Sequence, residues 1–218
     1  MIKQFVIVIS IVLTFAARGQ VQHDLESWSG LKIDVELLKK LEFKMDGQIR
    51  FDQNISRHRS SLFEIGIGYK PFKWLMLTPA YRITRTGDVN NDFGRANMDI
   101  TFDTDIGKDF KIKNRTRGQY AYFYNRVGSE IELRNKTQLD YNLSKLFDPF
   151  TSIEFFYSEE TISDFRLRLG GNWRINKEID LRTFYAMESQ MGRKTNDKEH
   201  IVGIILKINV NAKKKKKK

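Results

Sequence analysis

Residues 41–52 read Leu-Glu-Phe-Lys-Met-Asp-Gly-Gln-Ile-Arg-Phe-Asp, a segment in which apolar side chains alternate with charged or polar ones. Successive side chains of a β-strand point to opposite faces, so a strand over this segment has one apolar and one charged face. The same alternation recurs along the chain, for example over residues 63–70, 98–105 and 165–169. The sequence therefore predicts an all-β protein built from amphipathic strands.

The N-terminal residues have the features of a secretory signal. Lys3 precedes an apolar run over residues 5–15, which is too short to span a bilayer as a helix, and Ala17 and Gly19 supply small residues at a cleavage position. We expect residues 1–19 to be removed on export through the periplasm. No cysteine occurs in the chain, which excludes disulfides and thiolate metal sites.

The net charge of +11 is concentrated outside the predicted strands. Six positive charges form the run Lys213–Lys218, and Lys3 and Arg18 belong to the predicted signal, which leaves about +3 for the rest. We expect residues 20–210 to form one β-barrel and residues 211–218 to form a disordered, lysine-rich tail. The nearly balanced charge of the barrel gives no reason to expect nucleic-acid binding.

An exported chain of amphipathic strands is typical of an antiparallel transmembrane β-barrel in the outer membrane, where alternate residues face lipid. We identify eleven candidate strands, and because antiparallel closure needs an even number, the prediction is ten to twelve strands. Twelve are favoured, with Val21–Ser27 as a short extra strand. The connections alternate in length, as expected for short periplasmic turns and longer outer loops, and aromatic residues flank both sets as interfacial girdles do.

The charged faces decide which side is the interior. Many ions in a dry core would each be costly, whereas a water-containing lumen tolerates them. If Ile106 lies opposite Phe110, the inward residues of this hairpin form oppositely charged cross-strand pairs. These pairs are Asp105 with Lys111, Asp103 with Lys113, and Asp99 with Arg117.

The mixture of signs on the inward faces predicts weak ion selectivity. Such charge ladders either brace a narrow barrel or line a lumen that binds or conducts small charged solutes. The candidate lumen-lining residues are Asp99, Asp103, Asp105, Lys111, Lys113, Arg115, Arg117, Arg134, Arg166 and Arg168.

Catalysis has little support. The only histidines are His23, His58 and His200, and a hydrolytic site at the outer rim, acting on lipid or peptide, would have to use His58 or His200. No metal-ligand spacing and no phosphate-binding loop occurs, so we expect no enzyme activity, no metal and no cofactor. A second alternative is a soluble exported β-sandwich that binds a partner, with its apolar faces packed together.

Several segments, in order, resemble a family of outer-membrane barrels from Bacteroidetes-type bacteria known as domain of unknown function 2490. They are Trp28, Gln48–Phe51, Glu64–Trp74, Tyr81-Arg82, Asp148–Phe150, Glu154–Phe156 and Phe165–Gly170. Together they extend over most of the chain that follows the signal. The resemblance implies an outer-membrane location and carries no assigned activity, substrate or catalytic residue.

Overall fold

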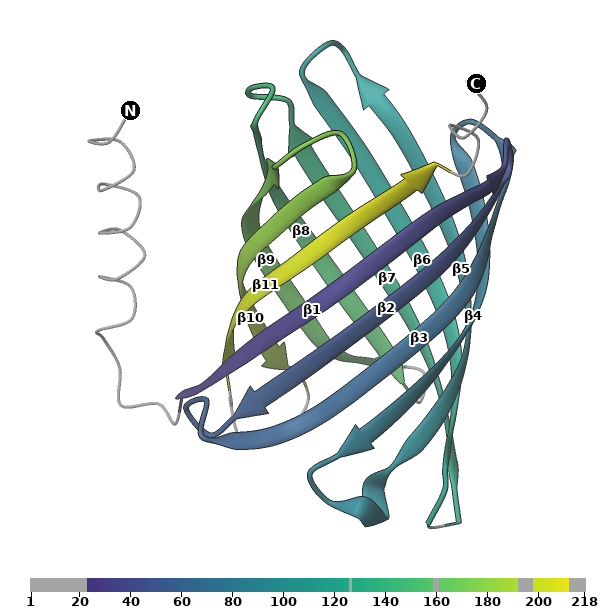
Figure 1. Ribbon diagram of the computed structural model, residues 1–218. Coiled ribbons are helices and arrows are strands. Elements are labelled where there is room, and N and C mark those ends of the chain that lie inside the picture. The colour runs from purple at the N-terminus through teal and green to yellow at the C-terminus, as the bar shows by residue number, and fades with distance from the viewer. Residues whose placement is uncertain (1–22, 126, 159–160, 192–197, 212–218) are drawn as a thin grey trace.

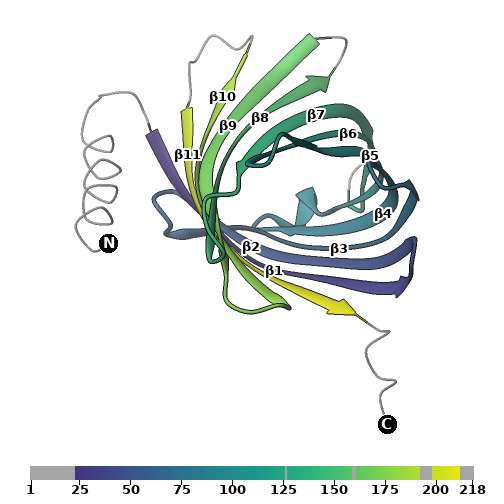
Figure 2. The same ribbon diagram turned by 90° about the horizontal axis from the view of Figure 1, so that it is seen from above.

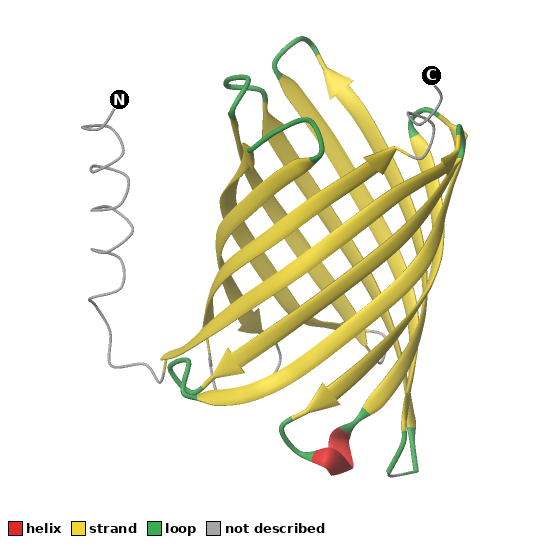
Figure 3. Cartoon of the chain, viewed as in Figure 1, coloured by secondary structure: helices red, strands yellow, loops and turns green. Residues whose placement is uncertain are grey.

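The computed structural model describes residues 23–125, 127–158, 161–191 and 198–211, and in these residues eleven strands close into one barrel (Figures 1 and 3). The predicted signal and the lysines of the predicted tail lie outside the described residues. The strands are β1 (His23–Leu38), β2 (Leu41–Asp52), β3 (Arg57–Phe72), β4 (Leu75–Thr86), β5 (Phe93–Ile106), β6 (Phe110–Phe123), β7 (Ser129–Tyr141), β8 (Phe147–Ser158), β9 (Thr161–Arg174), β10 (Ile179–Gln190) and β11 (Lys198–Asn211).

The predicted all-β barrel of ten to twelve strands is confirmed. Each strand pairs antiparallel with the next, and β1 and β11 close the ring as a parallel pair from His23 with Lys198 to Glu36 with Asn211 (Figure 2). Because eleven strands alternate in direction, the first and last run the same way. No separate strand covers the described part of Val21–Ser27, since residues 23–27 are the beginning of β1.

The predicted register between β5 and β6 is also confirmed. Ile106 lies opposite Phe110, and the pairs Asp105 with Lys111, Asp103 with Lys113 and Asp99 with Arg117 are cross-strand neighbours. The ion pairs follow this register only in part, because Arg117 binds Asp99 directly, whereas Lys111 binds Asp103 diagonally, at 2.9 Å.

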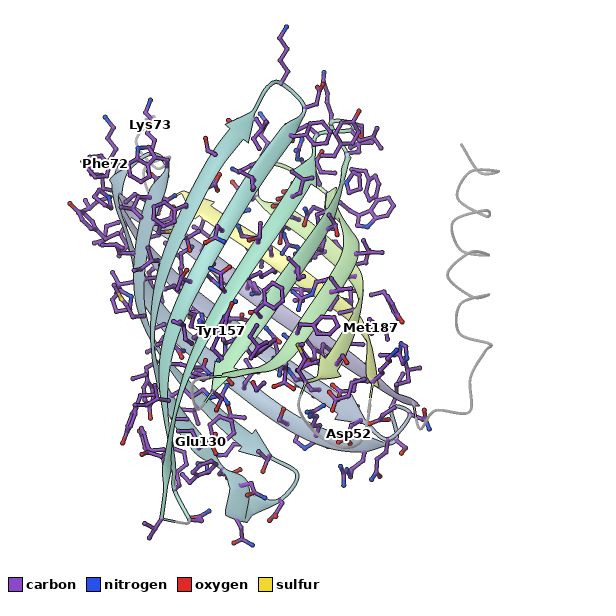
Figure 4. All side chains as sticks on the ribbon, turned by 180° about the vertical axis from the view of Figure 1, so that it is seen from behind. Asp52, Phe72, Lys73, Glu130, Tyr157 and Met187 are labelled. Carbon is purple, nitrogen blue, oxygen red and sulfur yellow. The ribbon has the colours of Figure 1, made fainter. Side chains whose placement is uncertain are left out.

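The connections fall into two sets at opposite ends of the barrel. Residues 39–40, 73–74, 107–109, 142–146 and 175–178 form what we call the turn rim, and the remaining connections form the loop rim. Most loop-rim connections have four to seven residues and most turn-rim connections two to four. The exceptions are residues 142–146 at the turn rim and the link between β8 and β9, where Ser158 pairs with Thr161. Figure 4 shows Phe72 and Lys73 at the turn rim, and Asp52 and Glu130 toward the loop rim.

The outer surface is apolar and carries the aromatic residues at its two ends. At the turn rim Trp74 stacks on Phe72 and Phe102, with ring centroids 5.2 and 5.9 Å apart. Toward the loop rim the Tyr81 hydroxyl is hydrogen-bonded to those of Tyr122 and Tyr124. Large apolar side chains between these ends, such as Ile65, Ile100 and Leu169, remain exposed.

This arrangement corrects the β-sandwich alternative. A sandwich would bury the apolar faces against each other, whereas the barrel turns them outward and places the charged faces inside. Among the described residues no helix is long and apolar enough to cross a membrane.

Candidate functional site

The interior of the barrel holds two adjoining cavities. The main cavity has a volume of about 490 Å³ and is lined by residues from all eleven strands, including Trp28, Arg50 and Arg168. The second, of about 440 Å³, reaches the turn rim at Lys70 and Lys73. Six residues line both cavities, so the two are neighbouring parts of one lumen: Asp34, Lys44, Met76, Thr101, Lys113 and Lys207.

The lining of the main cavity is strongly basic. Nine arginines and five lysines face it, against five aspartates and two glutamates, so the formal charge of the lining is +7. The expectation of weak selectivity rested on a nearly equal mixture of signs along the strands, and the lining of this cavity does not have that balance. The two signs are unevenly distributed in space, because several inward carboxylates, such as Glu188 and Glu199, do not line this cavity.

Most of the predicted lumen residues lie at these cavities. The main cavity is lined by Asp99, Lys113, Arg115, Arg117, Arg134, Arg166 and Arg168. The second is lined by Asp103, Lys111 and again Lys113. Asp105 is exposed near the turn rim and lines neither cavity.

Glu154 holds three of these arginines together. Its side chain is 3 % exposed. Oε1 accepts hydrogen bonds from Arg115 and Arg134, both at 2.9 Å, and Oε2 accepts one from Arg166 at 3.3 Å. Both oxygens of this carboxylate are therefore engaged by residues of β6, β7 and β9.

Glu64 is the corresponding centre on the opposite wall. It accepts hydrogen bonds from Arg82 at 2.9 Å and from Arg117 at 3.1 Å. Arg117 also donates to both oxygens of Asp99, at 2.5 and 2.8 Å. A bidentate pair of this kind fixes the guanidinium plane, so Arg117 connects the two acidic residues rigidly.

Five cations of the lining make no ion pair with any described residue: Arg50, Lys113, Lys136, Arg168 and Arg182. The arrangement also places like charges side by side. Arg82 lies opposite Arg95 in the register, and Arg115 lies opposite Lys136. Like charges directly across a strand pair are destabilising, so the lumen concentrates positive charge at a cost to stability.

A row of alternating aromatic residues and glycines forms one wall of the lumen. Along neighbouring strands the register runs Trp28, Gly203, Phe184, Gly170, Phe150, from β1 through β11, β10 and β9 to β8. A Cβ on Gly203 would lie 2.0 Å from Cζ of Phe184, and a Cβ on Gly170 would lie 2.9 Å from Cε1 of Phe150. The rings therefore lie flat over the glycines, and we call this wall the aromatic–glycine row.

Arginines stack on the rings of this row. The guanidinium carbon of Arg168 lies 4.4 Å from the ring centroid of Phe184, and that of Arg182 lies 4.7 Å from Phe150. Arg50 lies 3.9 Å from the ring centroid of Trp28. Attraction between a cation and a ring face holds each guanidinium in place.

The aromatic–glycine row was not predicted from the sequence, because the aromatic residues were interpreted as outward girdles. The signal that could have found it is the spacing of two phenylalanines. Phe150 and Glu154 lie an even number of positions apart, as do Phe184 and Arg182, so both rings lie on the inward face of their strands. The glycine partners could not be recognised, because they come from other strands.

The half of the lumen toward the loop rim is filled by side chains. Ala186 and Ile201 have no exposed surface, and Leu62 and Phe156 are 5 and 6 % exposed. None of these four residues lines either cavity. The open part of the lumen therefore extends from the turn rim to about the level of Trp28.

The histidines proposed for a hydrolytic site face outward. His58 Nε2 lies 2.9 Å from Ser61 Oγ, which is the contact of a base with a hydroxyl nucleophile. Asp52, the carboxylate nearest in sequence, is instead bound by Arg57. His200 Nδ1 contacts the Tyr185 hydroxyl at 2.5 Å. His58 and Ser61 thus form a base–hydroxyl pair. Among the described residues, no carboxylate is hydrogen-bonded to His58 to orient its imidazole.

The chain is similar in sequence to a family of unknown function and in fold to a solved porin. The family described as "Protein of unknown function (DUF2490)" matches residues 25–199. Among solved structures, a NanC porin in a rhombohedral crystal form is similar, with a TM-score of 0.55, 11% sequence identity, and coverage of 81% of this chain and 94% of the porin. A KdgM porin in complex with disordered oligogalacturonate has a TM-score of 0.46 and 10% identity, with 78% and 92% covered. No curated protein sequence matches the chain.

Proposed function

This chain belongs to the DUF2490 family of proteins of unknown function, and we propose that it is a narrow outer-membrane barrel that binds and passes small anions in preference to cations. Its fold is that of a small porin, as the likeness to the NanC porin shows. A Bacteroidetes-type source, an orientation with the turn rim toward the periplasm, and the absence of enzyme activity are parts of the same proposal.

The outer surface supports a membrane location. Exposed apolar residues cover the outside, and aromatic clusters lie at both ends, where amphipathic rings prefer the headgroup level. Such an apolar exterior on a barrel with a charged interior would be unfavourable in water. The lipid bilayer is therefore the partner that the outer surface fits.

The observation that carries the anion preference is the +7 lining of the main cavity. Fixed positive charge around a narrow lumen attracts anions and repels cations. Because side chains fill the half of the lumen near the loop rim, a passing anion has to move between them, so we expect a small conductance. Five unpaired lining cations leave donors for a passing or bound solute.

A planar-bilayer recording tests this function. Across a potassium chloride gradient, the zero-current potential should take the sign that chloride permeation gives. The variant Arg50→Gln/Lys113→Gln should move this potential toward zero, because it removes two unpaired cations of the lining. The matched control is Lys145→Gln/Lys177→Gln, which removes two charges from turn-rim connections outside the cavities.

Two results would overturn the proposal. One is the absence of current from the correctly folded protein under every ionic condition. The other is a potential of the sign that potassium permeation gives. An equal shift in the control variant would show that the surface charge of the whole molecule, and not the lumen, determines the preference.

A further inference from the structure

The three cations Lys136, Arg168 and Arg182 lie on neighbouring parts of one lumen wall and share the main cavity. They come from β7, β9 and β10. Within the described part of the chain none of them makes an ion pair, and the buried Nε of Arg168 has no hydrogen-bond acceptor in the protein. Carboxylates such as Asp140 and Asp180 lie near Arg182, but none of the described ones is within ion-pair distance of the three cations. Direct counter-charges are therefore missing at this wall.

The nearest carboxylate on this wall is already engaged. Lys136 lies opposite Glu154 in the register, but both oxygens of Glu154 bind Arg115, Arg134 and Arg166. Arg182 donates from Nε to the amide oxygen of Asn172, at 2.7 Å, which is neutral. The single negative charge of Glu154 is therefore already shared by three arginines.

The aromatic–glycine row makes this arrangement rigid. Phe184 supports Arg168, Phe150 supports Arg182, and the ring of Phe184 is itself fixed against Gly203. A guanidinium that stacks on a ring keeps its N–H groups at the edges, and here those edges can face the cavity. Preorganised, planar donors of this kind match the oxygens of a carboxylate or a phosphate.

We propose that Lys136, Arg168 and Arg182 form a binding site for a small polar solute that carries a carboxylate or phosphate group. The site deepens the proposed function, on which it rests for access to the lumen. The cavity of about 490 Å³ is in the range that holds a small organic molecule. Ser152, opposite Arg168 in the register, and Gln138 supply further polar groups beside it.

Binding to the full-length barrel in lipid nanodiscs tests the site. Citrate and inorganic phosphate are titrated separately by calorimetry at constant ionic strength, with chloride and glucose as comparison solutes. We expect citrate, phosphate or both to bind, and neither comparison solute to do so. The arm that binds identifies which of the two oxyanion groups the site prefers.

The variant Lys136→Gln/Arg168→Gln should weaken this binding by about tenfold or more, because each lost contact is a hydrogen bond to a charged group. Arg168→Lys should bind with intermediate affinity, since it keeps the charge but loses the planar fork. The matched control is Lys111→Gln/Lys207→Gln, which also removes two cations from the lumen but takes them from ion pairs with Asp103 and Asp34.

Each result decides the inference. Absence of binding by both oxyanions, or equal weakening in the control and the site variant, would overturn it. Failure of the site and failure of the channel are distinguishable: oxyanion binding without any bilayer current leaves the site and removes the channel. Anion-selective current without oxyanion binding would support the channel and overturn the binding site.

Discussion

At the scale of single residues, the lumen depends on a few carboxylates that each hold several arginines. Glu154 accepts hydrogen bonds from three guanidiniums while almost fully buried. A buried charge that loses its partner is strongly destabilising. Removing the charge of Glu154 would leave Arg166 with Glu188 as its partner. It would leave Arg115 and Arg134 with only distant carboxylates. A large effect on stability is therefore expected at Glu154.

We expect Glu154→Gln to lower the free energy of unfolding by about 3 kcal/mol, because Arg115, Arg134 and Arg166 lose their shared counter-charge. Urea unfolding of the barrel in lipid vesicles measures this value. The matched control is Glu42→Gln, which affects pairs with Lys44 and Lys70 near the turn rim, where solvent screens them. The control should lose less than about 1 kcal/mol; equal losses would contradict the role given to Glu154.

Asp92 gives a second prediction at this scale, in the connection between β4 and β5. Its carboxylate accepts hydrogen bonds from the Thr86 amide at 2.7 Å and from Arg85 at 2.8 Å. These bonds lower the pKa of Asp92 below its usual value, with the Thr86 amide as the largest cause. The bonds therefore add stability fully above about pH 4, and this is lost as the pH falls through the lowered pKa.

Hydrogen exchange of the Thr86 amide, corrected for its intrinsic rate, measures the effect. Protection should be constant at neutral pH and decrease in acid below about pH 4. Asp92→Asn should show the weaker protection already at neutral pH, because a neutral amide is a poorer acceptor. Protection that is the same in both proteins and at every pH would rule out this role of the carboxylate.

At the scale of strands, the aromatic–glycine row shows how five strands cooperate to make one wall. Each strand contributes one residue, and the glycines leave the space in which the rings lie flat. The rings in turn hold the arginines that face the cavity. The orientation of the Arg168 guanidinium on β9 thus depends on the absence of a Cβ at Gly203 on β11.

We expect Gly203→Ala to destabilise the barrel by about 1–3 kcal/mol, because the added methyl group cannot share the space of the Phe184 ring. It should also weaken oxyanion binding, since Phe184 supports Arg168. Thermal unfolding and the titration described above measure both effects. The control is Gly118→Ala, where a Cβ would have no neighbour within 4 Å; a comparable loss there would contradict the explanation.

At the scale of the whole molecule, the parallel pair of β1 and β11 is the seam of the barrel. Arg59 reaches from β3 to this seam and binds Glu26 on β1 and Glu199 on β11, the latter at 3.1 Å. Glu26 has no exposed surface and also accepts a hydrogen bond from the indole of Trp28 at 2.8 Å. One side chain therefore ties both edges of the closing pair together.

We expect Arg59→Met to loosen this seam, because Glu26 would stay buried without its cation. Hydrogen exchange of β1 and β11 should increase more than that of β5 and β6, and unfolding should require less urea. The control Arg57→Met removes a neighbouring arginine whose ion pair within the described residues is with Asp52, in its own hairpin. If the two variants changed the exchange of β1 and β11 equally, Arg59 would have no special role at the seam.

Much of the barrel could be predicted because alternation is a local property. A period of two residues assigns each side chain to a face, so the inward positions of Asp99, Arg117 and Arg168 and the register of β5 on β6 followed from residues near each other in the chain. The closing pair could not be predicted in this way. Whether the first and last strands pair parallel or antiparallel depends on whether the total number of strands is odd or even. Counting Val21–Ser27 as a separate strand gave an even number and therefore an antiparallel closing pair, whereas the barrel closes with a parallel pair.

The sequence by itself determined an amphipathic β-barrel with a charged interior, because the apolar and ionic halves of each strand cannot share one environment. Only the tertiary structure decided which charges meet. Glu154 gathers three arginines while Lys136 and Arg168 stay unpaired, and this distribution makes the cavity basic. The physical reason is that ion pairing depends on distances of a few ångströms between strands, which no pattern within one strand contains.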